Sequence, residues 1–154
     1  MTSISFQNQT LIVPFDFSKA AENALNQVLK WADESNQIHL VYVAVPSTTI
    51  VDLNPPYWMP PNLDSVTREK VLEELKERFG KEPYSRVNLH CLVGDPGAEI
   101  TKLAESESAN AIVMPSHGRS GVSRMLLGSV AERVLRMAHC PVLVLKEGEN
   151  EKQS

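Results

Sequence analysis

Apolar residues gather in five short segments along the chain, and the stretches between these segments space their apolar residues differently. The five segments have the length and β-branched content of buried strands, and they cover residues 11–13, 38–45, 87–93, 111–114 and 142–145. In the stretches between them, apolar residues recur three or four positions apart, as on one face of an α-helix. The pattern predicts five strands that alternate with four helices.

Each predicted helix has a set of apolar residues on one face. The first would bury Ala21, Ala24, Leu25, Val28 and Ala32, the second Leu72, Leu75 and Phe79, the third Ile100, Leu103 and Ala104, and the fourth Val130, Ala131, Val134, Leu135 and Ala138. Ser18 stands before the first helix as a natural N-cap. Strands that alternate with helices imply right-handed crossovers. We therefore expect a single-domain α/β fold, a doubly wound five-stranded parallel sheet with helices on both faces.

Two segments depart from this rhythm. Residues 87–93 alternate apolar and polar side chains, which indicates a less covered strand at an edge of the sheet. Residues 46–61 hold five of the chain's ten prolines and predict a long loop. The loop's Tyr57, Trp58 and Met59 could cover a ligand or a partner, although packing onto the body of the protein is the simpler interpretation.

The composition is that of an ordinary globular domain. With 154 residues, 42% hydrophobic and 22% charged, the chain suits one self-sufficient core rather than a disordered segment. A net charge of -4 and a pI near 5.6 give no general attraction to nucleic acid or to anionic membranes. Because no leader or membrane-spanning apolar run is found, we expect a cytoplasmic protein whose Cys91 and Cys140 are reduced.

Two loops are expected to meet where a ligand would bind. In an open parallel sheet, ligands bind beyond the carboxyl ends of the strands, where neighbouring crossovers leave to opposite faces. The first strand is followed by residues 14–18 (Pro-Phe-Asp-Phe-Ser), and the fourth by residues 115–119 (Pro-Ser-His-Gly-Arg) and then by Gly128 and Ser129. These segments face each other if the first and fourth strands are neighbours.

The residues of these loops suit a nucleotide. Gly128 and Ser129 stand just before the last helix, whose amino-terminal amides and dipole favour a phosphate, and Arg119 adds positive charge nearby. Asp16 is suited to accept hydrogen bonds from ribose hydroxyls. Together these groups indicate a nucleotide rather than inorganic phosphate.

Each of these residues also has a purely structural interpretation. Ser129-x-x-Glu132 is a capping box that closes a helix without any ligand, and spacing alone does not choose between the two interpretations. Asp16 could be a turn residue before Ser18, and Gly118 could permit an unusual dihedral in a tight loop. Their convergence on one crevice favours the nucleotide.

The sequence resembles the universal stress protein family, from residues 12–18 (Ile-Val-Pro-Phe-Asp-Phe-Ser) to residues 139–144 (His-Cys-Pro-Val-Leu-Val). The most specific stretch is residues 116–118 (Ser-His-Gly), nine further residues, and then residues 128–132 (Gly-Ser-Val-Ala-Glu). It is similar to the family's nucleotide signature, Gly-x-x-Gly-x9-Gly followed by Ser or Thr. Residues 93–96 (Val-Gly-Asp-Pro) and 40–43 (Leu-Val-Tyr-Val) add to the likeness.

The resemblance implies a strand order of 3-2-1-4-5 and a binding site for ATP or another adenine nucleotide, accompanied by magnesium or manganese. Asp16 would meet the ribose, and the backbone near Val43 would meet the adenine. The full set of implied binding residues is Pro14, Phe15, Asp16, Val43, Met114, Pro115, His117, Gly118, Arg119, Gly128, Ser129 and Val130. Of these, Gly118, Gly128, Ser129 and Val130 would hold the phosphates.

The resemblance also implies a homodimer joined through the last strand, Val142, Leu143, Val144 and Leu145. A bare apolar edge of this kind is a liability unless something pairs with it. Residues 1–147 would form the single family-like domain, and residues 148–154 a polar tail.

Pro115 departs from the signature because it occupies the place of the first glycine. Proline has no amide hydrogen and a fixed φ, so a hydrogen bond worth roughly 0.5–1.5 kcal/mol is lost, about a tenfold change in affinity at most. We expect a stress-response module that binds an adenine nucleotide. The alternative is a homodimer that no longer binds nucleotide and acts through contacts with another protein.

Catalysis and metal chemistry find less support in the sequence. Ser116 and His117 are adjacent, so their side chains are expected to point apart near a strand end, and no Gly-x-Ser-x-Gly elbow is present. At most, slow ATP hydrolysis is expected. The neighbouring pairs His90-Cys91 and His139-Cys140 lack ordinary zinc spacing, which favours cysteines that are buried or at the core boundary.

Overall fold

Strands and helices alternate in the predicted order in the computed structural model, which describes residues 6–45, 65–117 and 127–146. The strands are β1 (Thr10–Pro14), β2 (Gln37–Ala44), β3 (Val87–Val93), β4 (Ala111–Pro115) and β5 (Val142–Leu145). The helices are α1 (Lys19–Trp31), α2 (Ser65–Phe79), α3 (Pro96–Ser106) and α4 (Ser129–Met137). Predictions for the proline-rich segment 46–61, its aromatic residues 57–59 and the tail 148–154 fall outside the described residues.

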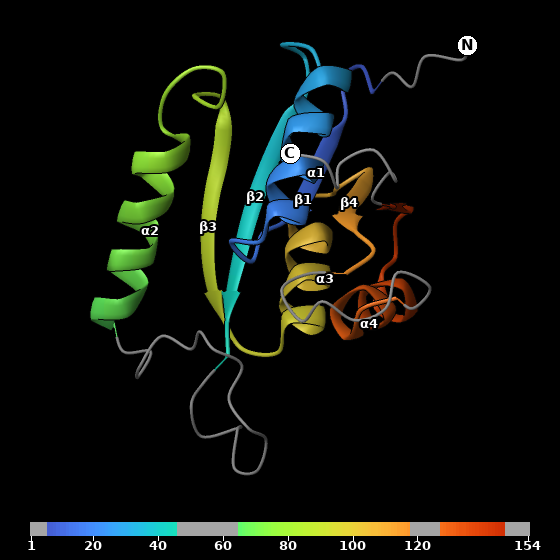
Figure 1. Ribbon diagram of the computed structural model, residues 1–154. Coiled ribbons are helices and arrows are strands. Elements are labelled where there is room, and N and C mark those ends of the chain that lie inside the picture. The colour runs from blue at the N-terminus through green and yellow to red at the C-terminus, as the bar shows by residue number, and fades with distance from the viewer. Residues whose placement is uncertain (1–5, 46–64, 118–126, 147–154) are drawn as a thin grey trace, which may run out of the picture.

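The five strands form one parallel sheet in the order β3-β2-β1-β4-β5. This order confirms the prediction, including the adjacency of the first and fourth strands on which the proposed crevice depends. Leu11 lies opposite Ala111, and Ile12 lies opposite Ile112. Because all strands are parallel, their carboxyl ends meet at one edge, the lower edge in Figure 1.

Helices cover both faces of the sheet, as predicted (Figure 1). One core lies under α1 and α2, where Leu25 and Leu75 pack against Leu11 and Leu40. The other core lies under α3 and α4. There Ile100 and Val134 pack with Ile12, which points to the other face of the sheet from Leu11. Successive strand residues therefore enter different cores, which explains why the central strands are apolar without interruption.

Both edges of the sheet are visible in the burial pattern. The alternating segment 87–93 is indeed an edge strand, and the opposite edge is β5, whose four residues are all only partly buried. The prediction that Leu135 faces the core is wrong, since its side chain is 42% exposed. In the short helix α4, Ala131 and Val134 are the buried residues that face the sheet. Leu135, the residue after Val134, lies outside this contact.

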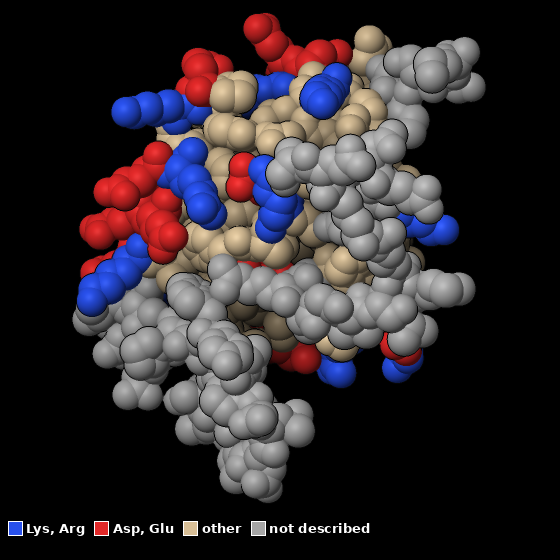
Figure 2. Space-filling model, in the orientation of Figure 1, with Lys and Arg blue, Asp and Glu red and all other residues tan. Residues whose placement is uncertain are grey.

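The surface carries no continuous basic area over α2. Figure 2 shows acidic side chains gathered along the left flank of the molecule, over this helix. Glu69, Glu73, Glu74 and Glu77 are all exposed there. None of the helices in the described part of the chain combines the length and the hydropathy that a membrane span requires.

Candidate functional site

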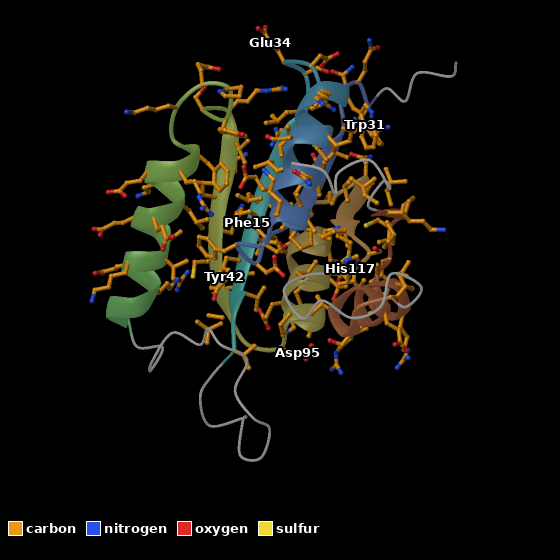
Figure 3. All side chains as sticks on the ribbon, viewed as in Figure 1. Phe15, Trp31, Glu34, Tyr42, Asp95 and His117 are labelled. Carbon is orange, nitrogen blue, oxygen red and sulfur yellow. The ribbon has the colours of Figure 1, made fainter. Side chains whose placement is uncertain are left out.

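The helices that follow β1 and β4 lie on opposite faces of the sheet, which is the arrangement in which open parallel sheets bind ligands between the two strand ends. β1 leads into α1 on one face and β4 leads toward α4 on the other. From the pair Leu11 and Ala111, five further residues along each strand lead to Asp16 and Ser116. In Figure 3, Tyr42 and His117 lie in the lower half of the molecule, where the strands end, and Trp31 lies at the opposite end. The two predicted loops therefore share one edge of the sheet.

Asp16 sits in a tight turn between β1 and α1. Its Oδ1 accepts a hydrogen bond of 3.0 Å from the Ser18 amide, and the Ser18 side chain accepts one of 3.1 Å from the Ala21 amide as the N-cap of α1. Phe17 between them adopts a φ of 62°, in the left-handed region. The turn interpretation of Asp16 is thus correct, and the turn holds a partly exposed carboxylate at the end of β1.

The residues before Asp16 contribute backbone rather than side chains. The Phe15 amide donates to the Val41 carbonyl oxygen at 2.8 Å, which prolongs the β1–β2 ladder by one residue. The Phe15 ring is buried and packs edge-on against Phe17 and Phe79, under α2. Pro14 is also buried. Any contact of these two residues with a ligand in the crevice must therefore come from the main chain.

The amino terminus of α4 is capped by a glycine, which has no side chain to offer. Gly128 is the N-cap, no side chain bonds to the first turn among the described residues, and Ser129 is already helical. The capping box suggested by the sequence does not form. The Glu132 carboxylate instead lies 2.7 Å from Nη2 of Arg136. The helix dipole at this end is left for something other than a capping side chain.

Gly128 is also pressed against the chain that leaves β4. Its amide donates to the Ser116 carbonyl oxygen at 2.7 Å, and the Ser116 amide donates to the Leu145 carbonyl oxygen at 3.0 Å. A Cβ at position 128 would lie 3.3 Å from Cα of His117, closer than ordinary contact. Since the Gly128 amide is already used, the amides of Ser129 and Val130 are the ones placed to meet an anion.

Ser116 and His117 do not point apart, which corrects the prediction. The Ser116 hydroxyl lies 3.0 Å from Nδ1 of His117. At the same place, the Ser116 carbonyl oxygen accepts the hydrogen bond from the Gly128 amide. Ser116 is only 9% exposed, so its hydroxyl orients the imidazole and is poorly placed to attack a substrate.

The other predicted residues divide into three groups. Val43 is partly buried and lies two residues past Val41, the partner of Pro14, so it is level with Asp16. Met114 is buried in the core under α3 and α4, Val130 packs against that core, and Pro115 ends β4 opposite Leu145. Gly118 and Arg119 lie outside the described residues.

The cysteines behave as the sequence predicted. Cys91 is buried and Cys140 is partly buried, and both are free. Burial raises the pKa of the Cys91 thiol and of the Cys140 thiol, which makes both poor nucleophiles at neutral pH. Among the described residues, no three metal-ligating side chains stand close enough together to hold an ion. The sequence analysis missed one contact, a histidine pair formed by His39 and His90.

The order and direction of the strands place the chain in the class of doubly wound parallel α/β proteins, with the amino terminus of α4 near the switch point between β1 and β4. Comparison with known proteins identifies the group within that class. The model of the universal stress protein family matches residues 7–146, and the chain belongs to this family.

Individual relatives are similar along most of their length. Universal stress protein MJ0531 of Methanocaldococcus jannaschii is 33% identical, over 92% of this chain and 84% of that protein. Universal stress protein MJ0577 of the same organism is 30% identical, and its solved structure superposes with a TM-score of 0.71 over 94% of this chain and all of that one. The universal stress protein of Archaeoglobus fulgidus in complex with dAMP has a TM-score of 0.61 at 21% identity, over 90% and 98% of the two chains, and shows the shared fold.

Ser18, the N-cap of α1, and Ser129, the first residue of α4, should differ in their effect on stability. Replacing Ser18, whose side chain caps α1, with Ala should lower the free energy of unfolding by about 1 kcal/mol. Ser129→Ala should change it by less than about 0.5 kcal/mol, because this side chain makes no cap. Urea denaturation of the ligand-free protein measures both. An equal loss in the two variants would mean that Ser129 caps α4 in solution.

Proposed function

We propose that this protein binds an adenine nucleotide in the crevice between β1 and β4 and acts as a regulatory module of the stress response in the cytoplasm. The observation that carries the proposal is the pairing, at one switch point, of the Asp16 carboxylate with the amino terminus of α4, whose N-cap Gly128 has no side chain. The family membership and the dAMP complex of the Archaeoglobus fulgidus protein support it.

Each part of a nucleotide has a chemically suitable neighbour in this arrangement. The Asp16 carboxylate accepts hydrogen bonds from ribose hydroxyls, and the main chain near Val43, level with Asp16, borders the adenine. The amides of Ser129 and Val130 face the phosphates with the positive end of the α4 dipole behind them. His117, oriented by Ser116, lies beside the same helix end.

We propose ATP with magnesium or manganese as the ligand. A triphosphate carries more charge than the two amides of the α4 terminus offset, and a divalent cation supplies the remainder. Neither Cys91 nor Cys140 is suited to bind this cation, because each is a neutral thiol that is buried or partly buried. The cation would therefore be bound mainly by phosphate oxygens and water.

Pro115 weakens this site without removing it. Its ring nitrogen ends β4 next to the crevice and has no hydrogen to donate. The turn that follows is still held by the Gly128–Ser116 hydrogen bond of 2.7 Å, so the α4 terminus keeps its position. The loss amounts to one hydrogen bond, about tenfold in affinity at most.

Calorimetric titration with ATP and magnesium tests the binding site. Gly128→Val should abolish binding, because the added methyl groups fill the space between α4 and His117. Pro115→Gly should bind equally well or up to about tenfold more tightly. Ser106→Val, exposed on α3, is the matched control and should bind like wild type. Absence of ATP, ADP and AMP binding by wild type and Pro115→Gly would favour the rival function, a dimer acting through another protein.

We also propose that two copies form a homodimer through β5. This strand ends the sheet, has a neighbour on one side only, and buries none of its four apolar residues fully. Leu135 and Met137 of the adjacent α4 are exposed beside it. An unpaired apolar edge of this kind is stabilised by pairing with its own copy.

Sedimentation velocity at micromolar concentration tests the homodimer. Wild type should sediment as a dimer, and Val144→Lys, which places a charge on the β5 edge strand, should sediment as a monomer. Val93→Lys introduces the same charge at the exposed end of β3, the opposite edge, and should remain dimeric. A monomeric wild type would overturn the proposal.

A further inference from the structure

Two histidines from neighbouring strands touch inside the sheet. Nδ1 of His39 on β2 lies 2.8 Å from Nε2 of His90 on β3, and the ring centroids are 5.1 Å apart. His39 is only 5% exposed, whereas His90 is partly buried. Both side chains point to the face of the sheet that α3 covers, because their neighbours Val41 and Leu92 belong to that core. The contact joins the edge strand to the rest of the sheet.

The hydrogen atoms of this pair can be assigned from the surroundings of His39. Its second nitrogen, Nε2, is buried, has no hydrogen-bond partner among the described residues, and lies 3.8 Å from Oε2 of Glu107 at the end of α3. If Nδ1 of His39 donated to His90, the lone pair on Nε2 would face the carboxylate without compensation. The reverse arrangement avoids this. Nε2–H of His90 donates to Nδ1 of His39, and Nε2–H of His39 points toward Glu107.

Few other charges act on the two rings. Within the described residues, Glu107 is the charged side chain that acts on both, and His39 also lowers the pKa of His90. On β3 the nearest polar neighbour of the same face, Asn88, donates to the Ile38 carbonyl oxygen. On α3, Lys102 is paired with Glu99 at 3.0 Å. Burial lowers the pKa of His39 and of His90, and Glu107 opposes the shift in both.

We propose that His39, His90 and Glu107 form a binding site for a single proton, which makes the attachment of the edge strand β3 sensitive to acid. The first proton adds to Nδ1 of His90 and leaves the bridge intact, since Nε2–H of His90 still donates to His39. Neutral His39 then lies between the positive His90 and the negative Glu107. In this arrangement the His90–His39 hydrogen bond is kept, and Nε2–H of His39 faces the Glu107 carboxylate 3.8 Å away.

A second proton cannot enter while the strands are paired. It would have to add to Nδ1 of His39, which would bring two N–H groups face to face at 2.8 Å. The paired state therefore holds one proton, whereas the two histidines of an opened edge each take one. Opening is consequently favoured as the pH falls.

The direction and size of the effect follow from proton linkage. Well above pH 6.5, the ordinary histidine value, both rings are neutral in either state and the cluster adds no pH dependence. Below it, the opened state binds more protons because the pKa values of the paired state are lowered. Where the difference is one proton, the equilibrium constant for opening rises about tenfold per pH unit. Opening separates β3 from β2, its one neighbouring strand in the sheet. The helix α2, which packs on β3, is expected to move with it.

Amide hydrogen exchange of the full chain between pH 7.5 and 5, corrected for the intrinsic chemical rate, tests the proposal. In wild type, the opening constant of the β3 amides should rise about tenfold per unit below pH 6, and that of the β4 amides should rise less. His39→Gln keeps an acceptor for His90 and a donor for Glu107, so this rise should disappear. His139→Gln, at an exposed histidine outside the cluster, should behave like wild type. An equal rise in β3 and β4, or a rise retained in His39→Gln, would overturn it.

Ring-nitrogen resonances of the wild-type histidines give a test that does not depend on how a variant folds. Both rings should carry their hydrogen on Nε2 at pH 7.5, and one proton should be taken up while the β3 amides remain protected. In Glu107→Gln that uptake should shift to lower pH, because the opposing charge is gone. Uptake of two protons by the paired state, or an Nδ1–H form of His39, would refute the assignment.

Discussion

The parallel pairing of β1 with β4 is the contact on which the candidate site depends. It joins two strands separated by almost a hundred residues and fixes the levels at which both end, through the pairs Leu11–Ala111 and Ile12–Ile112. Apart from Thr10 and Pro115, which are partly buried, both strands are buried between two cores, so a shift of one residue would move every side chain into the wrong core. Hydrophobic burial in the sheet thereby sets the position of Asp16 relative to the chain leaving β4.

The second half of the candidate site, at the amino terminus of α4, depends on Gly128, which has no side chain. Gly128 approaches the backbone of His117 closely, and its amide is used to close the turn after β4. A serine or aspartate at this position would cap α4 by itself and crowd the turn. Glycine instead supplies no capping side chain and lets the helix end approach the backbone of His117. Next to this turn, the Ser116 hydroxyl lies 3.0 Å from Nδ1 of His117.

Most of the fold could be predicted from the sequence, because continuous apolar strands and amphipathic helices are local signals. It also indicated the crevice, since the ends of β1 and β4 follow from strand order. Details that depend on tertiary contacts were not predictable. Leu135 has the spacing of a core residue, but Ala131 and Val134 already fill that contact. The capping box at Ser129 and Glu132 was ruled out by the position of the N-cap and by the Glu132–Arg136 pair.

The histidine pair shows a second kind of limit. His39 and His90 are fifty-one residues apart, and only the register of β2 against β3 brings their rings together. The sequence shows a histidine in each of the two strands, His39 in β2 and His90 in β3. The edge position of β3 was also predicted correctly. The 2.8 Å contact required the exact offset between the strands, which no local pattern encodes.

The hydrogen bond between Gly128 and Ser116 has a consequence for how this protein can vary. It joins residues twelve positions apart, so the intervening segment begins and ends at nearly the same place beside the crevice. Doubling the number of residues between two ends that are held together costs only about 0.6 kcal/mol. Because the hydrogen bond holds both ends of the connection, insertions between them would leave β4 and α4 in place, so the length of the chain can change here without altering the fold.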